Sequence, residues 1–418
     1  MNSISKKLIQ HTPILHFQGN LSNAGATLRA TEVKPKLDRF IIANLERPVP
    51  ADWKIGKTNA LKYKLKITVS SRTSEREREN LPMFFGKKKT AIKVVRTKSE
   101  DYDVTFEIFC LNESLRSNIE QLDWDSFFIA TNFGTRQSKG YGSFFPFESR
   151  VPTSLVGREI KIDKNTTYRV DSYFSPDIDS STASCSDIMN RIADVYKCLR
   201  SGINENGVYF KSLMFAYAKS ENEWWDKRTI KELKFKNKLD EDRKKHKDRS
   251  VPDPLAEQPT VDPQPVYPMF RDNLGLATIE LAWKERYGFS IIKKDVEGKI
   301  KRFKSPILFK PLFFGDKWYV FLLHREIPQA FREAIFDVDG LKFQTHNSFS
   351  MKSYLNYVFS IEDYRQYISK PILPDNCDTG TLNGSPKETQ PNDSTATIRA
   401  TNIDNDLKQL KHNYITIK

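Results

Sequence analysis

The chain has 418 residues, which is enough for two or three domains with a sizeable core. It carries 67 Lys and Arg against 53 Asp and Glu, a formal net charge of +14 that is not concentrated in one tail. A basic surface suits a polyanion, nucleic acid before an anionic membrane, although charge alone fits a basic protein without such a partner equally well. No window approaches the ~20 apolar residues of a membrane span, and no signal-peptide core opens the chain, so we expect a cytoplasmic protein without membrane contact.

Cysteine and histidine give no support for a disulfide framework or a metal site. The four cysteines are scattered and show no CxxC spacing: Cys110, Cys185, Cys198 and Cys377. The six histidines are equally dispersed, so a Cys/His zinc site is not indicated. We therefore predict no metal and no other cofactor.

The first elements in the chain are a strand and a helix. Residues 6–18 indicate a strand that is broken at Pro13. Residues 31–45 indicate a helix, with Thr31 as the expected N-cap and Pro35 near the first turn. Its apolar face consists of Val33, Leu37, Phe40, Ile41 and Leu45 at helical spacing, and Lys34, Lys36 and Arg39 lie off that face.

Alternating strands follow. In residues 61–69 Leu, Tyr, Ile and Val alternate with Lys62, Lys64, Lys66 and Thr68. The lysine row is either a second track for a phosphate backbone or simply the solvated face of a strand. A second strand covers Tyr102 to Cys110, and residues 86–98 between the two hold six cations and no acid. This order of elements predicts an α+β sandwich with an antiparallel sheet.

The composition changes after residue 150. Residues 186–202 indicate an amphipathic helix that buries Ile188, Ile192, Val195, Tyr196 and Leu199. The charged, proline-rich stretch at about 236–268 cannot bury a core and is expected to be an exposed insertion. An α+β pattern then returns, with a helix near 326–337. Residues 374–418 form a polar tail that we expect to be flexible, and 406–418 are a candidate for docking as a short element.

The stretch "FGTRQSKGYGSF", residues 133–144, combines three glycines with Arg136 and Lys139. Glycine lets a backbone approach a ligand closely, so a phosphate is the natural guess. A Walker loop is not indicated, because the order of Gly and Lys is inverted and no helix follows. A dinucleotide-binding fingerprint is not indicated either, because this stretch lacks the third glycine of that motif. A hairpin turn whose glycines serve only backbone geometry remains an alternative.

Three stretches of the chain resemble the RAMP superfamily of CRISPR-associated RNA-binding proteins. The loop 133–144 is similar to the glycine-rich loop of that superfamily. Thr12-Pro13, followed by Leu28-Arg29-Ala30-Thr31 and a helix, resembles the start of type III effector subunits, and the segment around Ser305-Pro306 resembles a later strand. The closest resemblance is to the two-domain type III-B (Cmr) effector subunit at the end away from the guide-RNA 5′ handle. The helix "VKPKLDRFIIANL", the proline-rich insertion and the polar tail depart from that pattern.

The resemblance implies a fold, a function and partners. It implies tandem ferredoxin-like or RRM-like domains, at 1–150 and 151–373, followed by the tail 374–418. The implied function is an RNA-binding subunit of a type III CRISPR effector in antiviral defence. Its implied partners are guide RNA, target RNA and other RAMP subunits. The contacts would be mostly to the RNA backbone, and Tyr141 could stack on a base. The residues expected to make them are Arg29, Lys34, Lys36, Arg39, Gly134, Arg136, Gln137, Ser138, Lys139, Gly140, Tyr141 and Gly142.

Three alternatives stay open. A RAMP endonuclease that processes precursor CRISPR RNA would need a general acid or base, and His11 and His16 are the candidates. Metal-dependent target cleavage would use an aspartate on a loop, with Asp101 and Asp103 the nearest. A standalone nucleic-acid-binding protein would have the same basic surface without partner subunits. The prediction is a subunit without catalytic residues.

Overall fold

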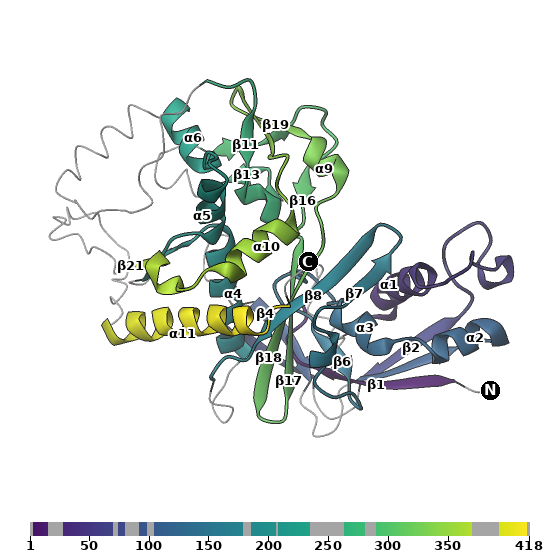
Figure 1. Ribbon diagram of the computed structural model, residues 1–418. Helices are drawn as coiled ribbons and strands as arrows, with labels where there is room; N and C mark the ends of the chain where they lie inside the picture. Colours follow the sequence, from purple (N-terminus) through teal and green to yellow (C-terminus); the bar gives the residue numbers. More distant parts are fainter. Residues whose placement is uncertain are drawn as a thin grey trace. The chain divides into compact units, whose positions relative to one another are not determined.

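The computed structural model divides into two compact units, which are described separately below (Figure 1). The first comprises Met1–Ala193, Ser305–Glu326 and Gln409–Lys418, and the second comprises Asp194–Lys304 and Ile327–Lys408. The structure describes residues 3–15, 28–69, 74–79, 92–97, 104–178, 185–205, 208–234, 263–280, 290–369 and 393–415. Within these ranges no helix is both long and apolar enough to cross a membrane.

The first unit opens with a four-stranded antiparallel sheet. Its strands are β1 (Ile4–Gln10), β2 (Lys64–Val69), β5 (Val104–Phe109) and β6 (Phe144–Pro146), in the spatial order β2-β5-β1-β6. Helix α1 (Ala30–Ala43) follows β1, and α2 (Glu113–Glu120) and α3 (Trp124–Ile129) follow β5. With the inserted hairpin of β3 (Ser74–Glu79) and β4 (Ile92–Thr97) set aside, this is the βαββαβ order of a ferredoxin-like domain. The fold class predicted from the sequence is confirmed.

One apolar core joins this sheet to its helices. Leu8, Phe106 and Ile108 of the sheet are buried together with Val33 and Leu37 of α1. Trp124 of α3 meets Phe106 edge-on, with ring centroids 5.7 Å apart. The helix begins one residue earlier than expected, after Arg29, and has no side-chain cap, so Thr31 is not its N-cap. Strand β1 ends at Gln10, before Pro13, and so is shorter than the predicted 6–18.

A second antiparallel sheet in the first unit is assembled from distant parts of the chain. Its order is β17-β18-β8-β7, from β7 (Glu159–Asp163), β8 (Thr166–Phe174), β17 (Ile307–Phe314) and β18 (Lys317–His324). The hairpin β17–β18 returns to pair with β8 after more than 130 residues of intervening chain. Helix α4 (Cys185–Arg200) follows β8 and buries all five apolar residues predicted for 186–202.

The second unit is built from short elements around aromatic side chains. Its sheets have the orders β11-β20-β19-β15 and β21-β10-β9, with the two-stranded pairs β12–β16 and β13–β14. Tyr217, Phe270, Phe349 and Tyr354 pack with edge-on and stacked rings. The elements are β9 (Ile203–Glu205), β10 (Val208–Phe210), α5 (Leu213–Ser220), α6 (Asp226–Lys234), β11 (Tyr267–Met269), β12 (Leu276–Ala277), β13 (Ile279–Glu280), β14 (Ile291–Ile292), β15 (Lys294–Asp295), β16 (Arg302–Phe303), α9 (Gln329–Glu333), β19 (Ile335–Val338), β20 (Leu341–Thr345), α10 (Met351–Ser360) and β21 (Ile368–Ser369).

Several expectations for the second half of the chain need correction. The region near 326–337 contains only the short helix α9, because strand β19 begins at Ile335. The polar tail contains α11 (Asp393–His412), in which Ile403, Leu407 and Leu410 form a buried stripe at helical spacing. The insertion at 236–268 lies mostly outside the described residues, and its end is the buried strand β11. The two compact units are each made of segments that interleave along the chain, and the domain ranges 1–150, 151–373 and 374–418 stay a prediction.

Candidate nucleic-acid interface

The glycine-rich loop connects α3 to β6 and has a backbone that requires glycine. Gly134, Gly140 and Gly142 have φ of 78°, 85° and 67°, in the left-handed region. A Cβ on Gly142 would lie 1.9 Å from the carbonyl oxygen of Phe133, and one on Gly134 would lie 2.7 Å from the carbonyl oxygen of Leu15. Arg136 also has a positive φ, of 56°. Glycine is therefore needed at positions 134 and 142, because other parts of the protein's own backbone lie very close to them.

The loop folds onto the segment that follows β1. The amide of Gly142 donates to Pro13 O at 2.9 Å, and the amide of Thr135 donates to Leu15 O at 2.7 Å. The Thr12 hydroxyl donates to Gly140 O at 2.6 Å and accepts from the amide of Ser143 at 3.0 Å. The Thr12-Pro13 element and the glycine loop are therefore one hydrogen-bonded structure, although more than 120 residues separate them in sequence.

The segment that follows Ser305-Pro306 also contacts the glycine-rich loop. Lys139 forms an isolated parallel bridge with Phe309 of β17, and the Phe309 amide donates to Ser138 O at 3.3 Å. The Ser143 hydroxyl donates to Pro311 O at 2.7 Å. The segment after Ser305-Pro306 thus supports the loop from the other side.

Many of the loop's amides are already used within the chain. The amides of Phe133, Thr135, Lys139, Gly140 and Gly142 donate to carbonyl oxygens, that of Ser143 donates to Thr12 Oγ1, and that of Gly134 donates to Glu32 Oε1 at 2.5 Å. N–H groups that donate within the chain in this way do not point to a phosphate oxygen. In this conformation they stabilise the loop, and side chains are left to reach a ligand.

The predicted site residues of the loop differ in exposure. Arg136 and Gln137 are half-buried, and the side-chain Nε2 of Gln137 donates to Gly134 O at 2.7 Å. Ser138 and Lys139 are 8% and 5% exposed, and Gly140 and Gly142 are buried. The ring of Tyr141 has no exposed surface, so it is not placed to stack on a base in this conformation.

The charged residues of α1 divide into those engaged within the protein and those facing solvent. Lys36 donates to Asn132 O at 2.6 Å, lies 3.6 Å from Glu32 and sits over the Phe133 ring. Lys34 pairs with Asp38 and sits over the Tyr63 ring at 4.0 Å. Arg39 is exposed and Arg29 is half-buried directly before the helix. Because Glu32 holds Gly134, Arg29 and Arg136 lie on segments that meet at the start of α1.

A buried lysine that the sequence analysis did not identify organises the base of the loop. The ammonium group of Lys310, on β17, has three acceptors: Thr131 O at 3.0 Å, Asn132 Oδ1 at 3.2 Å and Phe144 O at 2.8 Å. The side chain is fully buried, and burial, with nearby Lys36, lowers the pKa of Lys310 well below its usual range. The sequence signal was a single lysine inside the apolar run "PILFKPLFF".

The candidate catalytic residues do not form a described site. His11 is buried, and its Nδ1 accepts from the amide of Phe313 at 2.9 Å, so it acts as a structural acceptor. His16, Asp101 and Asp103 lie outside the described residues. Where side chains are described, no cluster of three or more His, Cys, Asp or Glu residues is placed to hold a metal ion.

The environment of His11 predicts an acid-sensitive contribution to stability. Burial and the nearby Lys310 lower the pKa of His11 to about 3. The folded state keeps the ring neutral while the unfolded chain protonates it below its usual pKa of about 6.5. The stability that the neutral His11 contributes is therefore fully present above pH 6.5 and is lost as the pH falls toward 3. By pH 5 the loss of unfolding free energy amounts to about 2 kcal/mol.

His11→Asn tests this effect, because the Asn Oδ1 can accept from the Phe313 amide without titrating in this range. Urea unfolding at pH 7 and pH 5 should show a smaller loss of unfolding free energy for the variant than for the wild type. Equal losses for both proteins would contradict the assignment of this titration to His11.

The first domain is ferredoxin-like, and its glycine-rich loop forms hydrogen bonds with the Thr12-Pro13 segment on one side and with β17 on the other. This combination defines a subunit of the RAMP class. The Cmr1 N-terminal domain model matches residues 1–203, and the Cmr1 C-terminal domain model matches residues 209–376. The chain belongs to the Cmr1 family, subunits of type III-B CRISPR effectors. No curated protein matches its sequence.

Proposed function

We propose that this chain is a non-catalytic RNA-binding subunit of its type III-B effector, which contacts the guide RNA, the guide–target duplex or both. The observation that carries the proposal is the meeting of the glycine loop with the start of α1, where Arg29 and Arg136 flank the Glu32–Gly134 hydrogen bond. Guanidinium groups suit phosphate oxygens because their donors are planar and permanently charged. Base pairing then supplies the sequence recognition, and the protein contacts the backbone.

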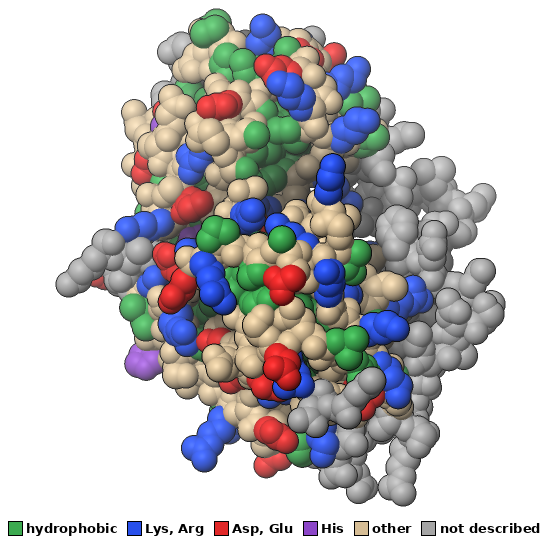
Figure 2. All heavy atoms as spheres, turned by 90° about the vertical axis from the view of Figure 1, so that its right-hand side faces the viewer, with side chains coloured by type: hydrophobic (Ala, Val, Ile, Leu, Met, Phe, Trp, Pro, Cys, Tyr) green, Lys and Arg blue, Asp and Glu red, His purple; other side chains and the backbone are tan. Residues whose placement is uncertain are grey.

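The charge distribution supports contacts made by local groups of cations. The net charge of the chain is +14, and Figure 2 shows Lys and Arg side chains scattered among Asp and Glu over the visible face rather than gathered into one patch. Affinity for RNA should therefore depend on the few cations that meet the backbone and should fall steeply with salt.

Three arginines at α1 and the loop that are not buried give a direct test. We expect the triple variant Arg29→Ala, Arg39→Ala, Arg136→Ala to bind single-stranded RNA more weakly, with the slope of log K against log salt reduced by roughly 2, about 0.7 for each lost phosphate contact. The thermal midpoint should stay close to that of the wild type, because none of the three side chains is buried. Fluorescence anisotropy at several salt concentrations measures the slope.

A matched control removes three exposed lysines elsewhere in the first unit: Lys57, Lys164 and Lys317. It lowers the net charge equally but should leave the slope within error of the wild type. Equal slopes for the two triple variants would mean that general charge, and not this site, attracts the RNA.

Purification of the tagged chain from its native host tests the biological role. Spacer-derived guide RNA together with other RAMP subunits is the expected result. Repeat RNA with one fixed cut end and no other subunit would replace the proposal with a processing nuclease. Unrelated RNA, or none, would mean that the family resemblance describes the fold and not the role.

A further inference from the structure

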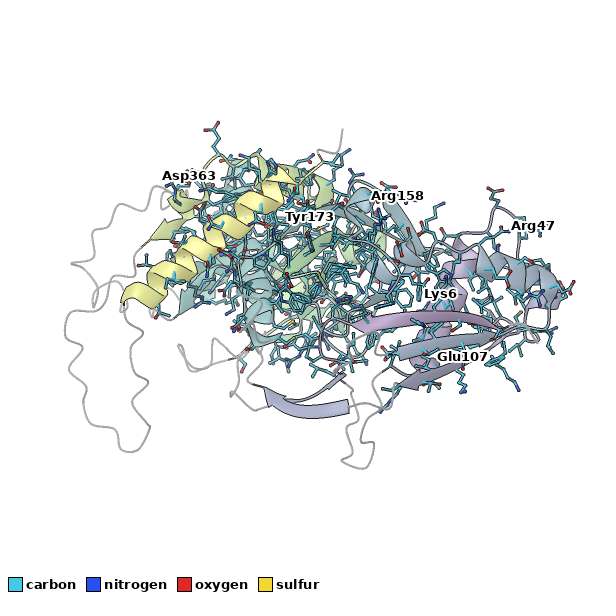
Figure 3. All side chains as sticks on the ribbon, turned by 90° about the horizontal axis from the view of Figure 1, so that it is seen from below. Lys6, Arg47, Glu107, Arg158, Tyr173 and Asp363 are labelled. Atoms are coloured by element: carbon cyan, nitrogen blue, oxygen red, sulfur yellow. The ribbon has the colours of Figure 1, made fainter. Side chains whose placement is uncertain are left out.

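Within the described residues, helices α1, α2 and α3 pack their apolar side chains on one face of the first sheet. In Figure 1 α1 and α3 lie above β1, so the view from below in Figure 3, where Glu107 of β5 is labelled, looks toward the opposite face. Val104, Phe106 and Ile108 of β5 point into the helix-covered core. Because side chains alternate along a strand, Thr105, Glu107 and Phe109 point to the opposite face, which we call the open face.

The strand register fixes which side chains are neighbours on the open face. Lys64 of β2 is directly opposite Phe109, and Lys66 is opposite Glu107 and lies 3.4 Å from it. On the other side of β5, Lys7 of β1 is opposite Thr105. Among the described residues of β1, β2 and β5, this face thus has three cations, Lys7, Lys64 and Lys66, and one carboxylate, that of Glu107.

A second phenylalanine lies on the same face. The amide of Phe147 donates to Lys7 O at 2.9 Å, which continues the pairing of β6 with β1 by one residue and places Phe147 beside Lys7. Phe109 and Phe147 are 38% and 39% exposed. Among the side chains that the structure describes, no other Phe, Tyr or Trp is in the exposed class.

The two rings are far enough apart to serve separate bases. They are separated by two strand spacings of about 4.8 Å and four residue rises of about 3.3 Å, which gives roughly 16 Å. Exposed aromatic rings among cations are the combination that single-stranded nucleic-acid binders use, with stacking for the bases and positive charge for the backbone. A protein partner fits less well, because lysine is depleted in the cores of protein interfaces.

We propose that the open face of the first sheet binds single-stranded RNA, with Phe109 and Phe147 each stacking on an unpaired base and Lys7, Lys64 and Lys66 contacting phosphates. The inference rests on the proposed function and extends it from backbone contacts near the glycine loop to a surface that holds unpaired bases. The rings would hold RNA bases without sequence preference, since every base has an aromatic face.

The test uses the full chain and two fluorescent probes of equal length: an oligouridine and an oligomer of the same backbone whose sites are abasic. Phe109→Ala and Phe147→Ala should each weaken oligouridine binding by about tenfold, since one stacked base contributes on the order of 1–3 kcal/mol. Binding of the abasic oligomer should be unchanged in both variants, because it has no bases to stack. Ile415→Ala, which truncates an exposed apolar side chain elsewhere in the unit, is the matched control.

The lysines give an independent measurement. Lys64→Glu with Lys66→Glu should weaken both oligomers and reduce the salt slope, whereas the phenylalanine variants should leave the slope unchanged. All of these side chains are exposed or at the surface, so circular dichroism and thermal midpoints should match the wild type.

The outcomes separate this inference from the proposed function. Loss of affinity in the arginine variants around the loop, together with unchanged oligouridine affinity in both phenylalanine variants, would overturn only the role of the open face. Equal weakening of the two probes by Phe109→Ala would rule out stacking. Loss of copurified subunits, with RNA affinity intact, would make this face a subunit contact. No RNA binding by any variant or by the wild type would overturn both proposals.

Discussion

Gly142→Ala should destabilise the first unit by on the order of 4 kcal/mol, the largest effect that we expect from a single methyl group. The added Cβ would lie 1.9 Å from Phe133 O, at a φ of 67° that an alanine rarely adopts. The left-handed backbone costs about 1–2 kcal/mol by itself. Relieving the clash would also disturb two hydrogen bonds, from Gly142 N to Pro13 O and from Phe133 N to Gly142 O, each contributing about 1 kcal/mol.

Gly56→Ala provides the matched control. Gly56 has a similar φ of 57°, but nothing lies within 4 Å of its added Cβ. The control should cost only about 1–2 kcal/mol for the backbone conformation. Urea unfolding of both variants therefore separates conformational strain from the contact with Phe133. Equal losses would show that the loop can move aside to make room for the methyl group.

Lys310→Met should be the second most damaging substitution, and it should reduce RNA binding as well as stability. Methionine keeps an unbranched apolar side chain but removes the donor shared by Thr131 O, Asn132 Oδ1 and Phe144 O. Buried acceptors left without a donor cost about 1–3 kcal/mol each, and the loss of an unfavourable buried charge offsets part of this. We expect a net loss of about 3 kcal/mol of unfolding free energy.

Lys317→Met, in the same hairpin but exposed, should change stability by no more than about 0.5 kcal/mol. RNA anisotropy at a temperature where both variants are folded then tests the loop itself. Weaker binding by Lys310→Met alone would show that Lys310 positions the loop for its ligand. Wild-type stability of Lys310→Met would show that the three acceptors find other donors.

The alternation of apolar and polar residues was sufficient to predict the main elements of the first domain. The strand at 61–69, the strand at 102–110 and the helices at 31–45 and 186–202 all exist, with ends that shift by no more than three residues. Their pattern is local, because each side chain is buried or exposed according to the period of its own element. The ferredoxin-like topology came from the resemblance, and the strand order confirms it.

Residue types and spacing also identified the three segments that form the glycine loop and its supports. Thr12-Pro13, the glycine loop and the segment after Ser305-Pro306 were selected separately in the sequence, and they contact one another in the fold. The sequence could not show in which direction the loop points. Glycine permits a close approach by a ligand and by the protein's own chain equally, and here the approaching groups are Pro13 O, Leu15 O and Phe133 O.

The sequence by itself determined the periodic elements, the basic charge and the motifs of the family, because these depend on residues close together in the chain. Only the tertiary structure decided the burial of Tyr141, the three acceptors of Lys310 and the register that places Phe109 beside Lys64. Each of these joins segments separated by tens to hundreds of residues, and burial or pairing at such distances follows from packing that no local pattern encodes. Helix α11 also depends on tertiary structure, because its few apolar residues stabilise a helix only when they are buried against other parts of the protein.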